Sequence, residues 1–492
     1  MEDKINEKDL KKINQIDYFF NPKNLAIIGG GKVNPFTVSN IILSNILAEG
    51  YIGKVYIVDI KPQADKIKGL RVYSSIFDVQ EEIDLALIIV PASVVEKVVE
   101  QCIEANVKAI IIISAGFGES LLYDETGIKL QKRINKLIRS TDTRIVGPNC
   151  NGVYSQTCRL NATLGPRIIL PPGNVSIVTR GGTAGVMLTM EAGKRNIGLN
   201  KYIGIGDESD LNLQDFIYYY EHDTHTKIIG TYTEGIKNVN SFYKILKNVK
   251  KPVVFYKSGN TYSGMRAALS HVGAIAGQFT KMIFDNVLEQ LRIVKAESID
   301  ELLNFVSAVS ISPLPKGKKV GIWTPGGSMG VIMTDNLEKV GLEVPQLSKN
   351  LIEKLDKLLK VKYWSHNNPV DVTDSYSPQS VDKSIDILLS SDNIDGVVVL
   401  IGLLFSKDEN YVDFSFINEL DDVFQMFIEQ LAKRFGQLIK KYNKPIFILA
   451  DNRGKIASMF KKRGVIILPT FESIAKTYKM LYDQYRYEKN LK

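Results

Sequence analysis

Cysteine, histidine and long apolar runs are all scarce in this chain of 492 residues. The three cysteines, Cys102, Cys150 and Cys158, neither pair evenly nor form a CxxC motif, so the sequence predicts neither a disulfide framework nor a structural zinc site. No apolar run approaches the roughly 18–20 residues of a membrane-spanning helix, and the charged start MEDKINEKDLKKINQ has no apolar segment of a secretory signal. We therefore expect a cytoplasmic protein that binds no metal and contacts no membrane.

A large excess of one charge sign is also missing, because 62 Lys and Arg oppose 54 Asp and Glu. The net charge of +8 is spread along the chain, without the dense basic stripe and interleaved aromatic residues of a nucleic-acid-binding protein. We expect no nucleic acid as a partner, whereas a polyphosphate ligand or an acidic partner subunit would suit a modest basic excess. The content of 45% hydrophobic and 24% charged residues is that of a globular protein with several domains.

Three segments resemble one another: LAIIGGG (Leu25–Gly31), VSIVTRGG (Val175–Gly182) and VGIWTPGG (Val320–Gly327). Each is an apolar strand that runs into a glycine turn and then into a helical pattern. Further apolar strands alternate with helices, which is typical of parallel sheets covered on both faces. The sequence therefore predicts an α/β protein of three doubly wound, mostly parallel-sheet domains, with boundaries at proline- and glycine-rich stretches that give domains 1–165, 166–312 and 313–492.

The first glycine turn, Gly29-Gly30-Gly31, opens toward a helix whose N–H groups and dipole would face an anion. Asp59, at the end of the next strand, could hold a ribose hydroxyl, and Lys61 could pair with a phosphate. These residues suggest a nucleotide or pyrophosphate ligand, although Asn34 stands where the dinucleotide fingerprint requires glycine. The alternative is that the glycines only permit a tight turn and that Asp59 caps it.

The second and third turns, Thr179–Gly185 and Thr324–Gly330, repeat the arrangement of small residues and a hydroxyl at the start of a helix. Close packing of helix against strand would explain either turn alone. Three such helix starts in one chain favour the handling of phosphoryl groups.

Of the four histidines, His222 and His225 lie in a polar loop, and His366 stands beside a predicted turn. His271 differs because small residues surround it in AALSHVGAIAG. A neutral imidazole can attack phosphorus when a carboxylate orients its other nitrogen. The alternative is that His271 is a loop histidine whose ring is hydrogen-bonded within the protein and takes no part in a reaction.

Several stretches, spread from about residue 20 to about residue 470, together resemble the NDP-forming acyl-CoA synthetases, relatives of succinyl-CoA synthetase. They are FNPKNLAIIGG (Phe20–Gly30), IIISAGFGE (Ile111–Glu119), GPNCNGV (Gly147–Val153), YTEGIKN (Tyr232–Asn238), KSGNTYSGMRAALSHVGAIAG (Lys257–Gly277) and NNPVDVT (Asn367–Thr373). The resemblance implies a Rossmann-like, coenzyme A-binding first domain followed by two flavodoxin-like domains, of which the second carries a phosphohistidine loop.

The resemblance also implies roles for individual residues. His271 matches the phosphohistidine, and Glu234 matches the carboxylate that orients it. The expected coenzyme A contacts are Gly29, Gly30, Gly31, Lys61 and Pro91; the expected phosphate contacts are Asn149, Gly182 and Thr183 and, in the third domain, Gly326, Gly327 and Gly330.

The chain departs from the family pattern at Val272, where Thr is usual, at Gly181, where Ser is usual, and at the first turn, which reads GGG in place of GAS. Arg180 and Thr183 could compensate for the missing hydroxyl at Gly181. No stretch resembles an ATP-grasp domain, so we expect an α-type subunit that needs a separate β-type subunit with ADP or ATP and Mg, assembled as α₂β₂ or similar.

With that partner, the chain would interconvert acyl-CoA, phosphate and ADP with the acid, coenzyme A and ATP through an acyl phosphate. The sequence leaves two other functions open. One is a non-catalytic coenzyme A-binding or regulatory protein of the same fold, and the other is an NAD-dependent oxidoreductase, which rests only on the first turn and Asp59.

Overall fold

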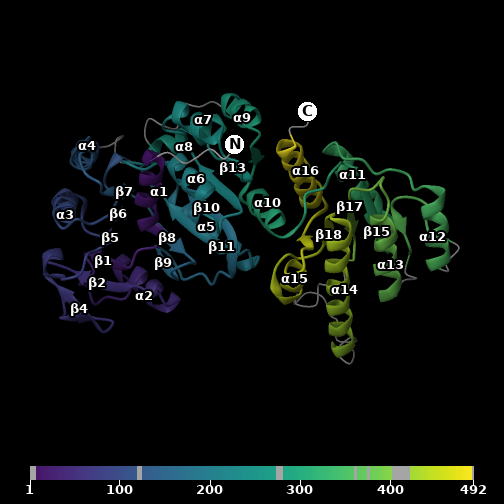
Figure 1. Cartoon of the computed structure of the whole chain (residues 1–492), viewed down its shortest axis with the longest axis horizontal. Coiled ribbons are helices and arrows are strands. Elements are labelled where there is room, and N and C mark those ends of the chain that lie inside the picture. The colour runs from purple at the N-terminus through teal and green to yellow at the C-terminus, as the bar shows by residue number, and fades with distance from the viewer. Residues whose placement is uncertain are drawn as a thin grey trace. The chain divides into compact units, whose positions relative to one another are not determined.

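The computed structural model describes residues 7–118, 125–272, 281–359, 363–373, 377–401 and 421–489 (Figure 1). The chain forms two compact units. The first unit comprises residues 1–193 and 198–297, and the second comprises residues 194–197 and 298–492. Three mostly parallel sheets, each accompanied by helices, confirm the predicted α/β class.

The first sheet lies in the first unit and has the strand order β3-β4-β2-β1-β5-β6-β7. All its neighbouring strands run parallel except β3 and β4. The order reverses beside β1, and ligands of doubly wound sheets bind at such a switch point, beyond the carboxyl ends of the strands. The strands are β1 (Asn24–Ile28), β2 (Lys54–Val58), β3 (Lys66–Ile67), β4 (Leu70–Tyr73), β5 (Leu85–Ile88), β6 (Ala109–Ile112) and β7 (Arg144–Val146).

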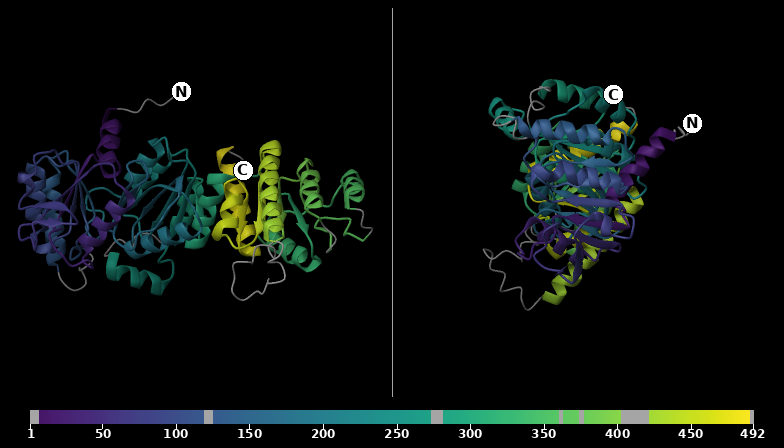
Figure 2. Two further views of the ribbon diagram at one scale, coloured as in Figure 1. Left: turned by 90° about the horizontal axis from the view of Figure 1, so that it is seen from below. Right: turned by 90° about the vertical axis from the view of Figure 1, so that its left-hand side faces the viewer.

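Helices lie on both faces of the first sheet (Figure 2), and alternate residues of its strands belong to two different cores. Leu25 and Ile27 of β1 pack in one core with α1 (Glu7–Phe20) and α2 (Val38–Glu49). Ala26 and Ile28 pack in another core with α3 (Ala92–Glu104) and α4 (Thr126–Ile138). This alternation explains the almost continuously apolar strand sequences, because both faces are buried.

The second sheet also belongs to the first unit, in the order β14-β13-β12-β10-β11-β8-β9. β8 (Gly152–Ser155) and β9 (Leu160–Thr163) are its antiparallel edge. The sequence analysis placed these residues in a first domain ending at 165, whereas the strands pair with the second sheet. The others are β10 (Pro172–Thr179), β11 (Leu199–Gly204), β12 (Ile228–Thr233), β13 (Val253–Lys257) and β14 (Val294–Ala296); the helices are α5 (Gly182–Lys194), α6 (Leu213–His222), α7 (Val239–Leu246), α8 (Tyr262–Val272) and α9 (Lys281–Gln290).

Helix α1 joins the two sheets of the first unit, since it contacts β6 of the first sheet and both β8 and α6 of the second. Its Phe20 ring stacks on Tyr219 of α6 with a centroid separation of 5.1 Å, and the edge of Phe19 meets Phe216. These four rings are buried in one apolar core that also includes residues of both sheets. Such a shared core favours a fixed arrangement of the two sheets.

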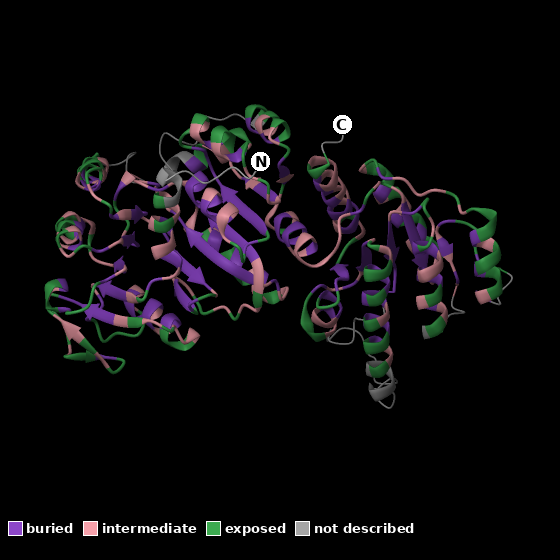
Figure 3. Cartoon of the chain, viewed as in Figure 1, coloured by how far each residue is buried: buried purple, intermediate pink, exposed green. Residues whose placement is uncertain are grey.

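The second unit contains a parallel sheet in the order β16-β15-β17-β18-β19. The third glycine turn of the chain follows β15 in this unit, and its Gly326 is the N-cap residue of α11. Figure 3 shows buried strands and helices with exposed outer faces. The elements are β15 (Val320–Thr324), β16 (Val370–Asp371), β17 (Gly396–Val399), β18 (Ile446–Leu449) and β19 (Ile466–Leu468), with α10 (Ile299–Ile311), α11 (Gly327–Lys339), α12 (Lys349–Leu359), α13 (Pro378–Leu389), α14 (Asp421–Tyr442), α15 (Gly454–Lys461) and α16 (Phe471–Glu488). None of the helices within the described ranges is long and apolar enough to cross a lipid bilayer.

The first glycine turn requires Gly29 for two reasons. Its φ is +94°, and a Cβ there would stand 2.3 Å from the carbonyl oxygen of Ile89, on the strand end beside it. Gly69 has a similar φ of +84°, but a Cβ on Gly69 would meet nothing within 4 Å. Alanine at Gly69 therefore tests backbone strain alone, whereas alanine at Gly29 tests strain together with steric overlap.

We predict that Gly69→Ala lowers the free energy of unfolding by about 1–2 kcal/mol through backbone strain alone. Gly29→Ala should lower it by more than about 3 kcal/mol, because a backbone carbonyl must also move. Urea unfolding of the full chain, followed by circular dichroism, measures both. Equal losses in the two variants would contradict the close approach at Gly29.

Candidate functional site

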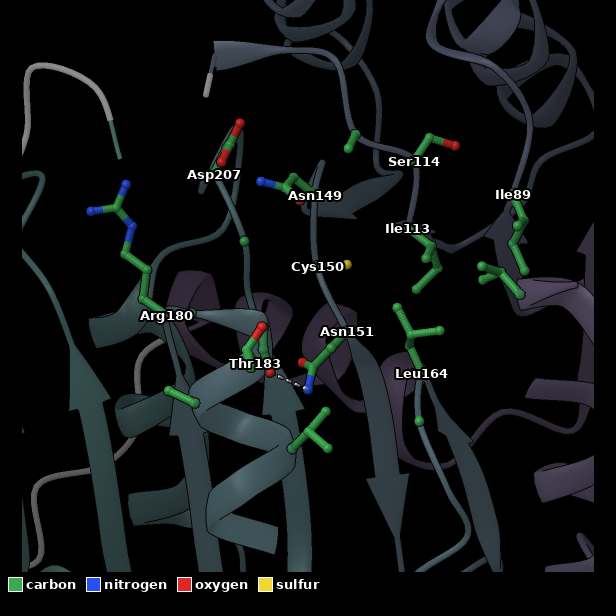
Figure 4. Close-up of a pocket in the computed structure, with 18 of the residues that line it drawn as sticks. Ile89, Ile113, Ser114, Asn149, Cys150, Asn151, Leu164, Arg180, Thr183 and Asp207 are labelled. Atoms are coloured by element: carbon green, nitrogen blue, oxygen red, sulfur yellow. Dashed lines mark hydrogen bonds between the residues drawn. The ribbon is translucent and has the colours of Figure 1, made fainter. Parts of the chain in front are cut away.

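A cavity of about 940 Å³ opens in the first unit where strands of both sheets end (Figure 4). Residues after β5, β6 and β7 line it from the first sheet, and residues after β9, β10, β11 and β12 line it from the second. The cavity therefore lies where a doubly wound fold binds ligands. The lining residues are Val38, Ile89, Val90, Pro91, Ala92, Ile113, Ser114, Ala115, Asn149, Cys150, Asn151, Leu164, Gly165, Arg180, Gly181, Gly182, Thr183, Ala184, Val186, Gly206, Asp207 and Glu234.

The two sides of this cavity differ in chemistry. Ile89, Ile113 and Leu164 gather on one side, whereas Arg180 and Asp207 lie on the other (Figure 4). An apolar wall next to a few polar groups is typical of a small-molecule site, in which the polar groups orient the ligand.

The N-terminus of α5 opens on the cavity through Gly182 and Thr183. The first N–H groups of a helix have no partner within it, and its dipole favours an anion there. Asn151 holds this helix start, because its Nδ2 donates to the Gly182 carbonyl oxygen at 3.2 Å and to the Tyr202 hydroxyl at 2.7 Å. The predicted phosphate residues Gly182, Thr183 and Asn149 are thus brought to one cavity, while Asn151 was not singled out from the sequence.

A buried charge pair lies beside the helix start. Arg180 Nε stands 3.7 Å from Glu208 Oε2, and both side chains are almost fully buried. Burial raises the pKa of Glu208, while the nearby Arg180 charge and the Leu213 N–H, which donates to Oε1 at 3.0 Å, oppose that rise. Nε and Nη1 of Arg180 have no hydrogen-bond partner within the described part of the chain. The guanidinium is therefore available to an anion in the cavity.

Glu234 follows the end of β12 and lines the same cavity. Its Oε1 accepts a hydrogen bond of 3.1 Å from the hydroxyl of Tyr232. The sequence analysis did not assign a role to Tyr232, although a residue two positions from Glu234 at a strand end was a signal for a shared face. His271 belongs to the last turn of α8, but its side chain lies outside the described part of the structure.

The first glycine turn borders a second, smaller cavity of about 340 Å³, whose lining includes Gly29, Asp59 and Lys97. Asp59 accepts hydrogen bonds of 2.9 Å on each carboxylate oxygen, from the backbone N–H groups of Gly31 and Lys61. Because these bonds build the turn, the capping role considered for Asp59 is observed. The basis for an NAD ribose contact is correspondingly weaker.

The other predicted coenzyme A contacts are distributed unevenly. Pro91 lines the larger cavity, at the start of α3. Gly30, Gly31 and the exposed Lys61 are absent from the described linings of both cavities. In the second unit, Gly326, Gly327 and Gly330 form the first turn of α11, and a Cβ on Gly327 would stand 2.9 Å from Asp371 Oδ2. A carboxylate thus lies close to that helix start.

The remaining histidines have local partners. His222 Nδ1 lies 2.8 Å from the Tyr218 carbonyl oxygen, and His366 stacks on Trp364 with its Nε2 3.0 Å from Asp356. Within the described ranges, no group of three or more His, Cys, Asp or Glu residues is arranged to hold a metal ion.

Comparison with known proteins agrees with this architecture. Residues 23–156 match the model of a CoA binding domain, and residues 172–309 match that of a succinyl-CoA ligase like flavodoxin domain. The chain is 34% identical to the α subunits of ADP-forming acetate–CoA ligases II and I of Pyrococcus furiosus, over 78% of its own length and 82% of theirs. Its structure resembles the acetyl-coenzyme A synthetase 1 of Ca. Korarchaeum cryptofilum, described as dinucleotide forming and solved with phosphate and ADP, with a TM-score of 0.82, 28% identity and coverage of 96% of this chain and 97% of that one. This chain therefore belongs to the NDP-forming acyl-CoA synthetase family, in which it groups with the α-type subunits.

Proposed function

We propose that this chain is the coenzyme A-binding, phosphohistidine-bearing subunit of an ADP-forming acyl-CoA synthetase. With a partner subunit it converts acyl-CoA, phosphate and ADP into the free acid, coenzyme A and ATP, and the reverse. The cavity at the joined strand ends carries the proposal, since it combines an apolar wall, the start of α5, a buried Arg180 and Glu234 in one space.

The reaction divides into steps that these groups can support. A phosphate oxygen attacks the thioester carbonyl, the C–S bond breaks, and the products are an acyl phosphate and the thiolate of coenzyme A, which takes up a proton. His271 then attacks phosphorus, the P–O bond to the acyl group breaks, and the acid leaves as a carboxylate. The phosphoryl group finally passes from His271 to ADP on the partner. Every intermediate is anionic, so fixed N–H donors and a buried cation stabilise it.

The described residues suggest how the substrates lie. We place the nucleotide part of coenzyme A at the smaller cavity, which Gly29 lines. Gly30, Gly31 and Lys61 lie outside the described lining of that cavity and stay proposed contacts, because Asp59 holds the N–H groups of Gly31 and Lys61 next to it. The pantetheine arm of coenzyme A then runs past Pro91 and along the apolar wall of the larger cavity. The phosphoryl group sits at the α5 start, held by the N–H groups of Gly182 and Thr183, with Asn149 beside it.

The remaining assignments concern the partner and the second unit. We propose an ATP-grasp β-type subunit that holds ADP or ATP with Mg²⁺, in an α₂β₂-type assembly within the cytoplasm. Gly326, Gly327 and Gly330 would offer the helix start of α11 to a phosphoryl group. The nearby Asp371 is a charge that such a group would have to displace or share.

The phosphohistidine is tested with intact-protein mass spectrometry after incubation with acetyl-CoA and phosphate. We predict one acid-labile phosphoryl group on the wild-type chain and none on His271→Ala, which retains coenzyme A binding because it leaves the first sheet unchanged. His225→Ala, at an exposed histidine of the same unit, should be phosphorylated like the wild type. Phosphorylation of His271→Ala would refute the assignment. No phosphorylation of the wild type with any acyl-CoA, even with an ATP-grasp subunit and ATP, would favour a non-catalytic coenzyme A-binding protein.

A carboxylate that orients the imidazole should be needed for rate and not for folding. We predict that Glu234→Gln slows phosphorylation of the chain by about 10²–10⁴-fold, because an amide cannot stabilise the cationic imidazole as a carboxylate does. Rapid-quench measurement of the phosphorylated fraction gives the rate. Glu289→Gln, at an exposed glutamate of α9, is the matched control. An unchanged rate in Glu234→Gln removes this residue from the mechanism.

A further inference from the structure

Tyr232 occupies an unusual place for a tyrosine, in the interior of the second sheet at the end of β12. Its backbone pairs with Thr179 of β10 on one side and with Tyr256 of β13 on the other. The residue is only 6% exposed, so its hydroxyl must find partners inside the protein. The partners are Glu234 Oε1 at 3.1 Å and Ser258 Oγ at 2.9 Å.

The chemistry of these three groups sets the direction of both hydrogen bonds. An ionised carboxylate only accepts, so the single proton of the Tyr232 hydroxyl goes to Glu234. Ser258 must then donate its own proton to the Tyr232 oxygen. Burial and the adjacent Glu234 charge raise the pKa of Tyr232, which keeps the phenol protonated. The result is a chain of donors that runs from Ser258 through Tyr232 to one oxygen of Glu234, and each bond in such a chain polarises the next.

The donor on Oε1 also fixes the rotation of the carboxyl group. A terminal carboxylate torsion is broad when nothing holds it. With Oε1 held by the phenol, the direction in which Oε2 faces is fixed as well. Tyr232 thereby contributes to the direction in which Glu234 presents its second oxygen, although the Tyr232 side chain is not among those that line the described cavity.

Gly181 makes room for this tyrosine. A Cβ on Gly181 would stand 2.9 Å from Cε1 of the Tyr232 ring, closer than real Cβ atoms approach a neighbour, and Gly181 has a φ of +134°. The Tyr232 ring thus fills the space in which a side chain at position 181 would begin. The missing hydroxyl at the second glycine turn and the presence of a buried phenol beside Glu234 are two parts of one packing arrangement.

We propose that Tyr232, supported by Ser258 and accommodated by Gly181, is a positioning residue for phosphoryl transfer, which holds the Glu234 carboxylate in its working orientation. The inference rests on the proposed function, because it assigns Tyr232 a role in the same transfer step. Tyr232 acts through Glu234, so its contribution should affect the rate of the step and leave the binding of acyl-CoA and phosphate unchanged.

The test compares single-turnover phosphorylation of the full chain by acetyl-CoA and phosphate in four variants. Tyr232→Phe keeps the ring and removes the donor, and we expect the rate at saturation to fall about 10- to 100-fold, as for the loss of a hydrogen bond to a charged group, with unchanged half-saturating concentrations. Ser258→Ala should lose about 3-fold. The double variant should be no slower than Tyr232→Phe, because Ser258 acts only through the phenol.

Tyr256→Phe is the matched control. Tyr256 stands beside Tyr232 on β13, with ring centroids 5.4 Å apart, and its hydroxyl has no hydrogen-bond partner among the described residues. It should react like the wild type.

The outcomes separate the two proposals. A phosphorylated wild type with an equally fast Tyr232→Phe overturns the positioning role and leaves the proposed function intact. A rate loss that is additive between Tyr232 and Ser258, or one shared by Tyr256→Phe, also overturns it. A wild type that is never phosphorylated overturns both proposals. Thermal unfolding of each variant, expected to match the wild type within a few degrees, shows that the losses are not caused by misfolding.

Discussion

Parallel strands all end at the same edge of their sheet, and this constraint decides where a ligand can meet the first unit. Two sheets end at one cavity because the chain passes directly from β7 to β8 through residues 147–151, and because α1 packs against both sheets. Everything proposed for this protein depends on that junction. The apolar wall comes mainly from the first sheet, the helix start and the charged groups from the second, and neither sheet alone supplies both.

The three glycine turns show how the same local pattern is used in three ways. At Gly29 the turn is closed by Asp59, whose two oxygens are held by backbone N–H groups. At Gly181 the turn opens on the large cavity and admits the ring of Tyr232. At Gly327 a carboxylate, Asp371, lies against the start of α11. A glycine turn before a helix can favour an anion, and the rest of the fold decides which group lies beside it.

The parts of the fold that depend on local pattern could be predicted from the sequence. Apolar strands alternating with helices were enough to predict three α/β sheets, and the second glycine turn was enough to predict a helix start that faces a ligand site. The GPN segment, which lines the same cavity, was singled out through the resemblance to a family. The resemblance to a family added the histidine and its carboxylate. The roles assigned to His271 and Glu234 stay predictions.

The parts that depend on long-range contact could not be predicted. The GVYS and LNAT strands, β8 and β9, are short. β8 pairs with β11, about 50 residues away, and β9 joins the sheet only through β8, so their place in the second sheet depends on contacts that the local pattern does not show. The Arg180–Glu208 ion pair joins two residues 28 positions apart. The role proposed for Tyr232 depends on its contacts with Gly181 and Ser258, which are distant from it in the sequence. Nothing in the spacing of these residues marks them as neighbours.

The protonation state of Cys150, a residue of the cavity wall, decides whether its sulfur can react with a thioester. Cys150 lines the cavity, yet its Sγ donates to the Ile112 carbonyl oxygen at 3.2 Å, and burial raises its pKa to about 12. Thiolates exchange readily with thioesters, whereas thiols do not. At neutral pH the side chain of Cys150 is therefore kept as the thiol. Under the proposed function, an activated acyl group in this cavity would meet a thiol and not a thiolate at Cys150, so it would stay available for the phosphate.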